Sequence, residues 1–255
     1  KMFTNNFDPV AFQILSFEIR WYSLAYILGI LLGWIYCKKI LIKNNELLNL
    51  FDDFVTYLIA GIIVGGRLGY VLFYDLTYFL NNPLEILMIW NGGMSFHGGL
   101  IGIIISSIIY ARKVDKNFYT FLDLVSVVAP IGIFFGRIAN FINSELYGTE
   151  TNVPWSVKFI LVDDLNRHPS QLYEAILEGL VLFLIIQYFV KKNLFLKPGL
   201  ISALFLIFYS LFRFLSEFFR SPDPHIGYLM FDLTLGQLIS IIFFFIGLTL
   251  FYKKK

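Results

Sequence analysis

Cysteine is almost absent from this sequence of 255 residues, since Cys37 is the only one. A single cysteine excludes an intrachain disulfide and a cysteine metal cluster. The three histidines are scattered without the spacing of metal ligands, and the sequence has neither a Walker loop nor a G-x-S-x-G elbow. We therefore expect no metal, no cofactor and no nucleic acid partner.

Charge is scarce as well. Charged residues make up 15% of the chain and hydrophobic residues 58%. In a typical soluble domain, about 25% of the residues are charged and about 45–50% are apolar. Seven apolar runs have the length of about 17–25 residues that crosses a hydrocarbon core. They predict an all-α, polytopic bundle of seven transmembrane helices forming one integral membrane domain, residues 1–255. The runs are 19–36, 54–74, 96–111, 118–138, 172–190, 200–219 and 233–252.

The segments outside these runs predict smaller features. Residues 7–18 and 77–90 mix aromatic and polar side chains, as interfacial segments do, so 7–18 is expected to be an interfacial N-terminal arm. Residues 149–167 are too few for a separate domain and predict a small extracytoplasmic cap. No cleavable signal peptide is evident, so we expect the first run to be retained as a helix.

Basic residues predict the orientation. Twelve lysines and arginines follow the first, third, fifth and seventh runs, and they are expected to lie in the cytosol. The N-terminus is then outside and the C-terminus cytoplasmic, which agrees with an odd number of spans. The twelve are Lys38, Lys39, Lys43, Arg112, Lys113, Lys116, Lys191, Lys192, Lys197, Lys253, Lys254 and Lys255.

Four arginines lie within or against the apolar runs: Arg20, Arg67, Arg137 and Arg213. An arginine at mid-bilayer costs roughly 3 kcal/mol on insertion scales, so these four must face a bundle interior, a cavity or phosphate headgroups. No lysine lies deep in a run, which argues against a retinal-type receptor. Glycines spaced as G-x-x-x-G favour close helix contact in three runs: Gly29 with Gly33, Gly61 with Gly65, and Gly132 with Gly136.

The stretch 136–148, GRIANFINSELYG, places polar residues at the end of an apolar run. Asn140 follows Arg137 by three positions and so shares its helical face, with Asn143 and Glu145 close beyond. Such a group predicts a site for a polar anion. In a later run Arg213 and Glu217 are spaced i,i+4. The sequence leaves two interpretations of this pair: a buried ion pair whose members satisfy each other, or a functional site.

A histidine beside two glycines, His97-Gly98-Gly99, begins the third run. His97 either caps a helix end or acts as a phosphate contact or proton carrier, and the sequence leaves both open. Arg137 and Arg213 are both expected toward the outer leaflet, where a phosphodiester headgroup matches the planar guanidinium fork. Because the chain offers no strong nucleophile at that depth, a lipid-using transferase is favoured. A transporter or flippase for an anionic lipid is the alternative.

The stretch 136–148 closely resembles the signature of the bacterial prolipoprotein diacylglyceryl transferases. The resemblance continues, in the family's order, through residues 20–22, 65–74, 92–102, 168–174 and 213–223. Two departures are Ala139, where the family usually has glycine, and the cap, which is short for the family. Family-important positions map onto Tyr22, His97, Arg137, Asn140, Glu145, Gly148, Arg213, Glu217 and Arg220.

The resemblance implies an enzyme of the bacterial cell membrane with its active site toward the outer leaflet. Its partners would be phosphatidylglycerol and the lipobox cysteine of a preprolipoprotein signal peptide, and the reaction would release glycerol phosphate. Arg137 and Arg213 would hold the departing phosphate, with Glu145 and Glu217 orienting them. Asn140 would bind glycerol hydroxyls, with Gly148, Arg220, Gly98 and Gly99 also at the lipid. The group that takes the thiol proton is left open between His97 and Tyr22.

Overall fold

The computed structural model describes residues 3–15, 17–222 and 227–255. Asp223, the last residue of the family resemblance, and His225 lie outside the described residues. The chain folds as two compact units, Lys1–Cys37 with Asp123–Lys255 (unit 1) and Lys38–Leu122 (unit 2). The expectation of one integral membrane domain stays a prediction.

Six of the described helices are long and apolar enough to cross a membrane, and they match six of the seven expected runs. They are Trp21–Leu41, Asn45–Phe73, Phe118–Ile142, Ser170–Lys191, Leu200–Phe219 and Leu235–Lys254. The remaining run forms helix α4 (Phe96–Lys113). This helix is less apolar because it carries His97 in its first turn and Arg112 and Lys113 in its last. A mostly helical protein with several helices long and apolar enough to span a membrane is thus confirmed.

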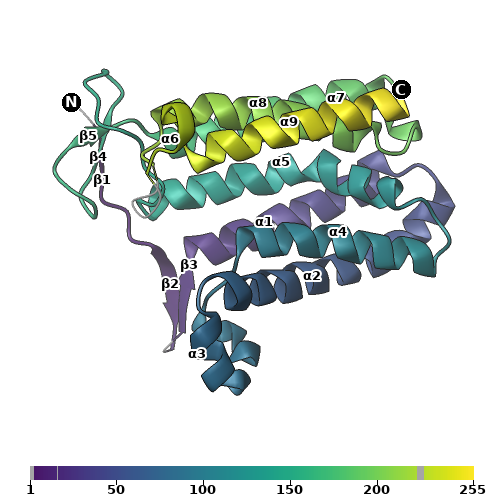
Figure 1. Cartoon of the computed structure of the whole chain (residues 1–255), viewed down its shortest axis with the longest axis horizontal. Helices are drawn as coiled ribbons and strands as arrows, with labels where there is room; N and C mark the ends of the chain where they lie inside the picture. Colours follow the sequence, from purple (N-terminus) through teal and green to yellow (C-terminus); the bar gives the residue numbers. More distant parts are fainter. Residues whose placement is uncertain (1–2, 16, 223–226) are drawn as a thin grey trace. The chain divides into compact units, whose positions relative to one another are not determined.

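Unit 1 contains five of these apolar helices, and α8 and α9 lie side by side (Figure 1). The π-helix η1 (Cys37–Leu41) continues α1 and lies in unit 2 after Cys37, and a second π-helix, η4, separates α6 from α7. The helical elements that lie wholly or mostly in unit 1 are α1 (Trp21–Tyr36), α5 (Phe118–Ile142), α6 (Ser170–Glu174), η4 (Ala175–Val181), α7 (Leu182–Lys191), η5 (Leu194–Leu196), α8 (Leu200–Ser216), η6 (Glu217–Phe219), η7 (Met230–Asp232) and α9 (Leu235–Lys254).

Side chains from one helix fix the position of the next in unit 1. A Cβ on Gly29 of α1 would lie 2.9 Å from the Cα of Gly132 in α5, so the predicted G-x-x-x-G packing occurs here. Asp123 of α5 is buried and accepts hydrogen bonds from the backbone of Gly199 and Ser202, at 2.7 and 2.8 Å. This carboxylate from α5 therefore satisfies donors that the first turn of α8 would otherwise leave unpaired.

Two small sheets show that the all-α expectation is too strict. Strand β1 (Phe3–Asn5) runs parallel to β4 (Val157–Phe159), and β5 (Asn166–Arg167) pairs antiparallel with β4. The expected cap thus joins the N-terminal residues in a sheet (Figure 1). The expected N-terminal arm forms an antiparallel hairpin of β2 (Val10–Ile14) and β3 (Phe17–Arg20). Pairing between distant segments has no local sequence signal, which is why it was not predicted.

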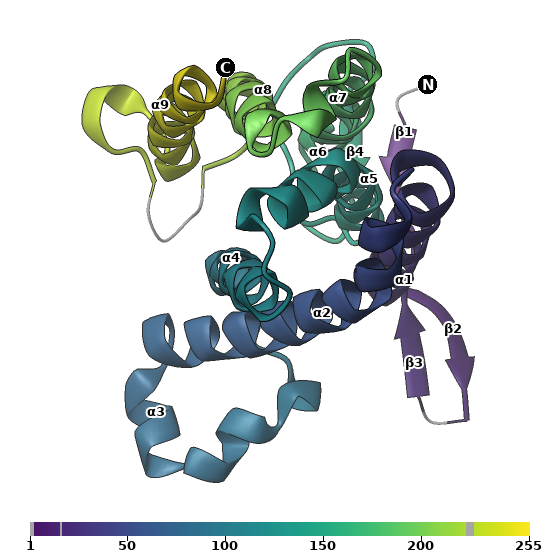
Figure 2. The same ribbon diagram turned by 90° about the vertical axis from the view of Figure 1, so that its right-hand side faces the viewer.

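In unit 2, α2 (Asn45–Phe73) packs closely against α4 through glycines on both helices (Figure 2). A Cβ on Gly98 would lie 2.3 Å from the carbonyl oxygen of Gly65, and one on Gly102 would lie 1.9 Å from that of Gly61. The segment between the two helices forms α3 (Leu76–Asn81), η2 (Pro83–Leu87) and η3 (Ile89–Asn91). Its apolar side chains are largely exposed, Leu84 at 74% and Trp90 at 76%.

Candidate functional site

Helix α5 ends at Ile142, and the residues after it fold back onto its last turn. The backbone N–H of Glu145 donates to the carbonyl of Asn140 at 2.9 Å, and Asn140 Nδ2 donates to Glu145 Oε2 at 3.0 Å. Asn143 donates to the other carboxylate oxygen at 3.3 Å. The three polar residues of the signature stretch therefore form one hydrogen-bonded group.

The loop 143–148 has a strained backbone, and side chains of helix α6 hold it in that conformation. Ser144 and Leu146 have φ angles of 57° and 55°, and such left-handed conformations cost about 1–3 kcal/mol each for residues other than glycine. The hydroxyl of Ser170 donates to the carbonyl of Leu146 at 3.0 Å, and Gln171 Nε2 donates to that of Glu145 at 2.6 Å. The start of α6 thereby stabilises the loop that carries Glu145.

Gly148 joins three segments that are distant in the chain. Its N–H donates to the carbonyl of His168 at 3.0 Å, and its own carbonyl accepts from Arg167 at 3.1 Å and from Ser221 at 2.8 Å. A Cβ here would lie 2.3 Å from the His168 oxygen and 2.5 Å from that of Phe219. Only glycine fits, and its backbone makes Gly148 a structural junction.

Arg137 points into a pair of buried glutamates. Its Nε lies 2.8 Å from Glu174 Oε2, and its Nη2 lies 3.2 Å from Glu178 Oε2. Both carboxylates are 0% exposed. Arg137 lies in the last turns of α5, and the two glutamates lie in α6 and η4. The polar residues of two separate helices therefore contact one another.

Arg213 binds the same two carboxylates from the end of α8. Its Nη1 lies 3.0 Å from Glu174 Oε1 and 3.4 Å from Glu178 Oε1, while Nη2 lies 2.5 Å from Glu217 Oε2. Arg220 reaches Glu174 Oε1 at 3.5 Å. The expected i,i+4 pair of Arg213 and Glu217 is therefore present, but it is one part of a larger arginine–glutamate cluster.

Two hydroxyls complete this cluster, which we define as Arg137, Arg213 and Arg220 with Glu174, Glu178 and Glu217. Ser216 donates to Glu178 Oε1 at 3.1 Å, and Thr234 donates to Glu217 Oε1 at 3.1 Å. Thr234 also caps α9. The cluster therefore draws on the ends of α5, α6, α8 and α9, all of which belong to unit 1.

Three positive and three negative groups balance in the arginine–glutamate cluster. Burying a charge is costly unless it is paired and hydrogen-bonded, and the carboxylates supply that pairing. The described contacts of Arg137 use Nε and Nη2, and those of Arg220 use Nη1. Because arginine has five N–H donors, an incoming anion has donors to bind at Nη1 of Arg137 without displacing these glutamates.

The carboxylates around the arginines differ in part from those expected. Glu217 contacts Arg213, as expected. The described hydrogen bonds of Glu145 come instead from amide groups of Asn140 and Asn143. The partners of Arg137 are the two buried glutamates of α6 and η4.

Tyr22 lies in the first turn of α1 and is partly exposed. Its hydroxyl lies 3.2 Å from that of Tyr26, and it is within electrostatic range of Glu145 and Arg137. The structure thus brings Tyr22 toward the signature stretch, while its nearest described polar partner is another tyrosine.

His97, Gly98 and Gly99 belong to unit 2. The cap of α4 is Ser95, whose Oγ accepts from the N–H of Gly98 at 3.2 Å, so His97 is not the capping residue. His97 is exposed, with its ring 5.5 Å from that of Phe96. Gly98 is occupied by helix packing, whereas Gly99 has no neighbour closer than 3.9 Å to an added Cβ.

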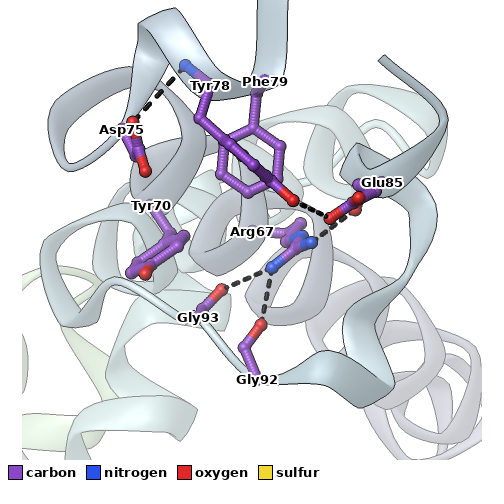
Figure 3. Close-up of a pocket in the computed structure, with 8 residues that line it drawn as sticks. All are labelled: Arg67, Tyr70, Asp75, Tyr78, Phe79, Glu85, Gly92 and Gly93. Carbon is purple, nitrogen blue, oxygen red and sulfur yellow. Dashed lines mark hydrogen bonds between the residues drawn. The ribbon is translucent and has the colours of Figure 1, made fainter. Parts of the chain in front are cut away.

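Arg67 lines a separate hollow of about 180 Å³ in unit 2 (Figure 3). Its guanidinium donates to backbone carbonyls, among them Ile86 at 2.9 Å and Gly92 at 2.6 Å. Tyr78 donates to Glu85 at 2.8 Å across the same hollow. Because backbone oxygens already surround the guanidinium, Arg67 holds the 85–93 segment in place and is not arranged to bind an anion.

The sequence analysis did not single out Glu178, and it covered Glu174 only as the last residue of the 168–174 stretch of the family resemblance. A signal existed, because two glutamates spaced i,i+4 in an apolar run lie on one helical face. Carboxylates buried in a membrane helix require partners as much as arginines do. Counting intramembrane acids against arginines would have found both residues.

Several apolar helices of membrane-spanning length, with a buried and balanced group of charges among them, are typical of a multi-pass membrane protein. A family model described as prolipoprotein diacylglyceryl transferase matches residues 9–253. The chain belongs to the prolipoprotein diacylglyceryl transferase family.

Curated relatives support this membership over nearly the whole chain. A protein of Rickettsia bellii (strain OSU 85-389) is 51% identical over 255 residues, covering 98% of this chain and 96% of its own length. One of Rickettsia typhi is 51% identical over 242 residues (94% and 93%), and one of Sinorhizobium medicae 49% over 252 residues (94% and 90%). All three are named phosphatidylglycerol–prolipoprotein diacylglyceryl transferase.

Proposed function

We propose that this chain transfers the diacylglyceryl group of phosphatidylglycerol to the lipobox cysteine thiol of preprolipoproteins. The product is a thioether, and glycerol phosphate is released. The observation that carries the proposal is the convergence of Arg137 and Arg213 on the same two buried carboxylates. The names of the relatives supply the substrates.

The chemistry follows from where charge develops. The thiolate sulfur attacks a glyceryl carbon, the carbon–oxygen bond breaks, and its electron pair leaves with the phosphate. Guanidinium groups aimed at that phosphate stabilise the transition state more than the bound lipid. Arg137 and Arg213 take this role, with Glu217 holding Arg213 in position.

The remaining substrate contacts rest on geometry around the signature stretch. In this proposal Asn140 binds the glycerol hydroxyls, and its hydrogen bond to Glu145 supports the role by fixing the orientation of the amide. The thiol has a free pKa of about 8.5 and must lose its proton before attack. Tyr22 and His97 are the candidate acceptors, and single-turnover rates of Tyr22→Phe and His97→Gln against pH distinguish them.

The proposed topology has seven spans, with α4 as the third. The N-terminus is outside, the C-terminus is in the cytosol, and the site lies toward the outer leaflet. The β2–β3 hairpin is the interfacial arm, and residues 149–167 are an extracytoplasmic cap. Single cysteines at Asn82, Lys116, Asn152 and Lys192 test this in a Cys37→Ser background. Labelling of position 116 from outside intact cells would overturn the orientation.

The function is tested with purified protein, phosphatidylglycerol and a lipobox peptide, with the product read by mass. A diacylglyceryl adduct that requires the peptide cysteine is the expected result. If phosphatidylglycerol crosses the bilayer without forming an adduct, the chain is a lipid transporter and the proposal is wrong.

A further inference from the structure

Glu178 connects the two central arginines through different oxygens of one carboxylate. Oε2 lies 3.2 Å from Arg137 Nη2, and Oε1 lies 3.4 Å from Arg213 Nη1. The same Oε1 accepts the hydroxyl hydrogen of Ser216 at 3.1 Å. Each carboxylate oxygen therefore has a fixed partner, and the side chain is 0% exposed.

The backbone around Glu178 is shaped to make this contact. Residues Ala175–Val181 form a π-helix between α6 and α7. Such segments are rare in proteins and occur frequently at functional sites. A π-turn has more residues than an α-turn, so positions four apart fall almost above one another. Glu174 and Glu178 consequently face the arginines together.

The electrostatic need for Glu178 is plain. Arg137 and Arg213 carry like charges, and each lowers the stability of the other's charged form in a low-dielectric site. A carboxylate between them offsets that repulsion and fixes the angle at which each guanidinium points. Glu174 bridges the same two arginines, at 2.8 and 3.0 Å, so removing the charge of Glu178 leaves one of two bridging carboxylates and loosens the mutual geometry of the guanidinium groups.

We infer that Glu178 is a positioning residue for transfer: it holds Arg137 and Arg213 at the mutual geometry that fits the departing phosphate. This inference rests on the proposed function. Glu178 does not touch the lipid, and its carboxylate competes electrostatically with the phosphate. It therefore weakens ground-state anion binding while it aligns the two guanidinium groups for the transition state.

Glu178→Gln tests the inference, because glutamine keeps the shape and the acceptor for Ser216 but removes the charge. We expect kcat to fall by about 10–100-fold, the size of effect that misplacement of catalytic groups produces. The KM for phosphatidylglycerol should stay the same or fall, because the cluster gains one net positive charge. For the same reason glycerol phosphate should bind more tightly, measured by calorimetry in detergent micelles.

Two further variants address folding. Ser216→Ala removes one hydrogen bond from Glu178 and leaves its charge, so a smaller fall in kcat with unchanged KM is expected. Asp123→Asn is the matched control, since Asp123 is also a buried carboxylate of unit 1 but caps α8 away from the cluster. It should lower thermal stability and retain the kcat of the folded fraction.

The outcomes separate this inference from the proposed function. Normal kcat in Glu178→Gln beside an active wild type would overturn the inference alone, as would a raised KM with unchanged kcat. A wild type without transfer activity would overturn the proposed function. The calorimetric comparison does not depend on turnover, and weaker glycerol phosphate binding by Glu178→Gln would sink the inference in either case. If Glu178→Gln fails to fold, unchanged kcat and KM in Ser216→Ala would do the same.

Discussion

The side-chain amide of Asn5 donates to the backbone carbonyl of Phe141 at 2.6 Å. Asn5 is fully buried in strand β1, and Phe141 lies in the last turn of α5. The N-terminal strand thus satisfies a carbonyl at the helix end from which the signature stretch emerges. Helix ends leave such carbonyls unpaired unless an outside donor reaches them.

Asn5→Ala should therefore destabilise the protein without changing the chemistry. A buried acceptor left unpaired costs about 1–3 kcal/mol. Asn6→Ala is the matched control, because the neighbouring amide is exposed, and it should stay within about 0.5 kcal/mol. Thermal unfolding in detergent measures both, and equal midpoints for the two variants would contradict the assigned role.

Arg137 and Arg213, which are proposed to hold the departing phosphate, form what we call the clamp. Lysine at either clamp position should keep the positive charge but lose most of the transfer rate. Lysine cannot form the paired hydrogen bonds of a guanidinium, and loss of one transition-state donor typically costs about 10²–10³-fold in turnover. We expect Arg137→Lys and Arg213→Lys to lose at least about 100-fold in single-turnover transfer at saturating phosphatidylglycerol. Arg20→Lys, at an exposed ion pair with Glu18, is the control. Near-normal rates for both clamp variants would refute the assignment.

Arg67→Lys should act on stability, and its transfer rate should fall less than those of the clamp variants. The guanidinium donates to the carbonyls of five residues, Glu85, Ile86, Met88, Gly92 and Gly93. Lysine has three donors, so at least two carbonyls lose their partner. Limited proteolysis of the 76–93 segment should be faster in the variant. If proteolysis is unchanged and the transfer rate is as low as that of Arg137→Lys, Arg67 takes part in the reaction and does not serve mainly to hold the segment.

Cys37→Ser should retain most of its activity, because the substrate supplies the sulfur. The side chain is 1% exposed at the end of α1, the opposite end from Tyr22. A modest loss of stability is expected from placing a hydroxyl there. The measurement is transfer rate per folded protein. A folded but inactive variant would indicate a covalent enzyme intermediate.

His168 should make stability depend on pH. Burial against the rings of Tyr173 and Phe219 lowers the pKa of His168, so the unfolded chain binds a proton more readily than the folded one. This contribution is fully present above the unfolded pKa of about 6.5 and is lost as pH falls below it. His168→Asn should reduce the dependence of the thermal unfolding midpoint on pH between about pH 7 and 5. If the midpoint of the variant changes with pH as steeply as that of the wild type, His168 is not the source of the pH dependence.

Length and apolarity predicted the helices well, because a hydrocarbon core imposes both on a spanning segment. The run 200–219 coincides with the helical span Leu200–Phe219. Arg137 and Arg213 were predicted as site residues because a charged side chain within an apolar helix is costly and must be paired or bind a ligand. Sequence could not show that Asn5 reaches Phe141, or that strand β1 pairs with β4. Those contacts depend on tertiary packing between segments with no shared local pattern. The partners of Arg137 were not predicted because Glu174 and Glu178 lie 37 and 41 residues further along the chain, with no local pattern that links them to the arginine.

The order of synthesis gives the arginine–glutamate cluster a further consequence. Arg137 is synthesised before Glu174 and Glu178. At about 5–20 residues per second, the interval of 37–41 residues lasts about 2–8 s. During that time the fourth apolar run carries an unneutralised cation into or beside the membrane. We therefore expect the run to stay at the insertion machinery or the bilayer surface until its acidic partners emerge, so that α5 and α6–η4 enter the membrane as a pair.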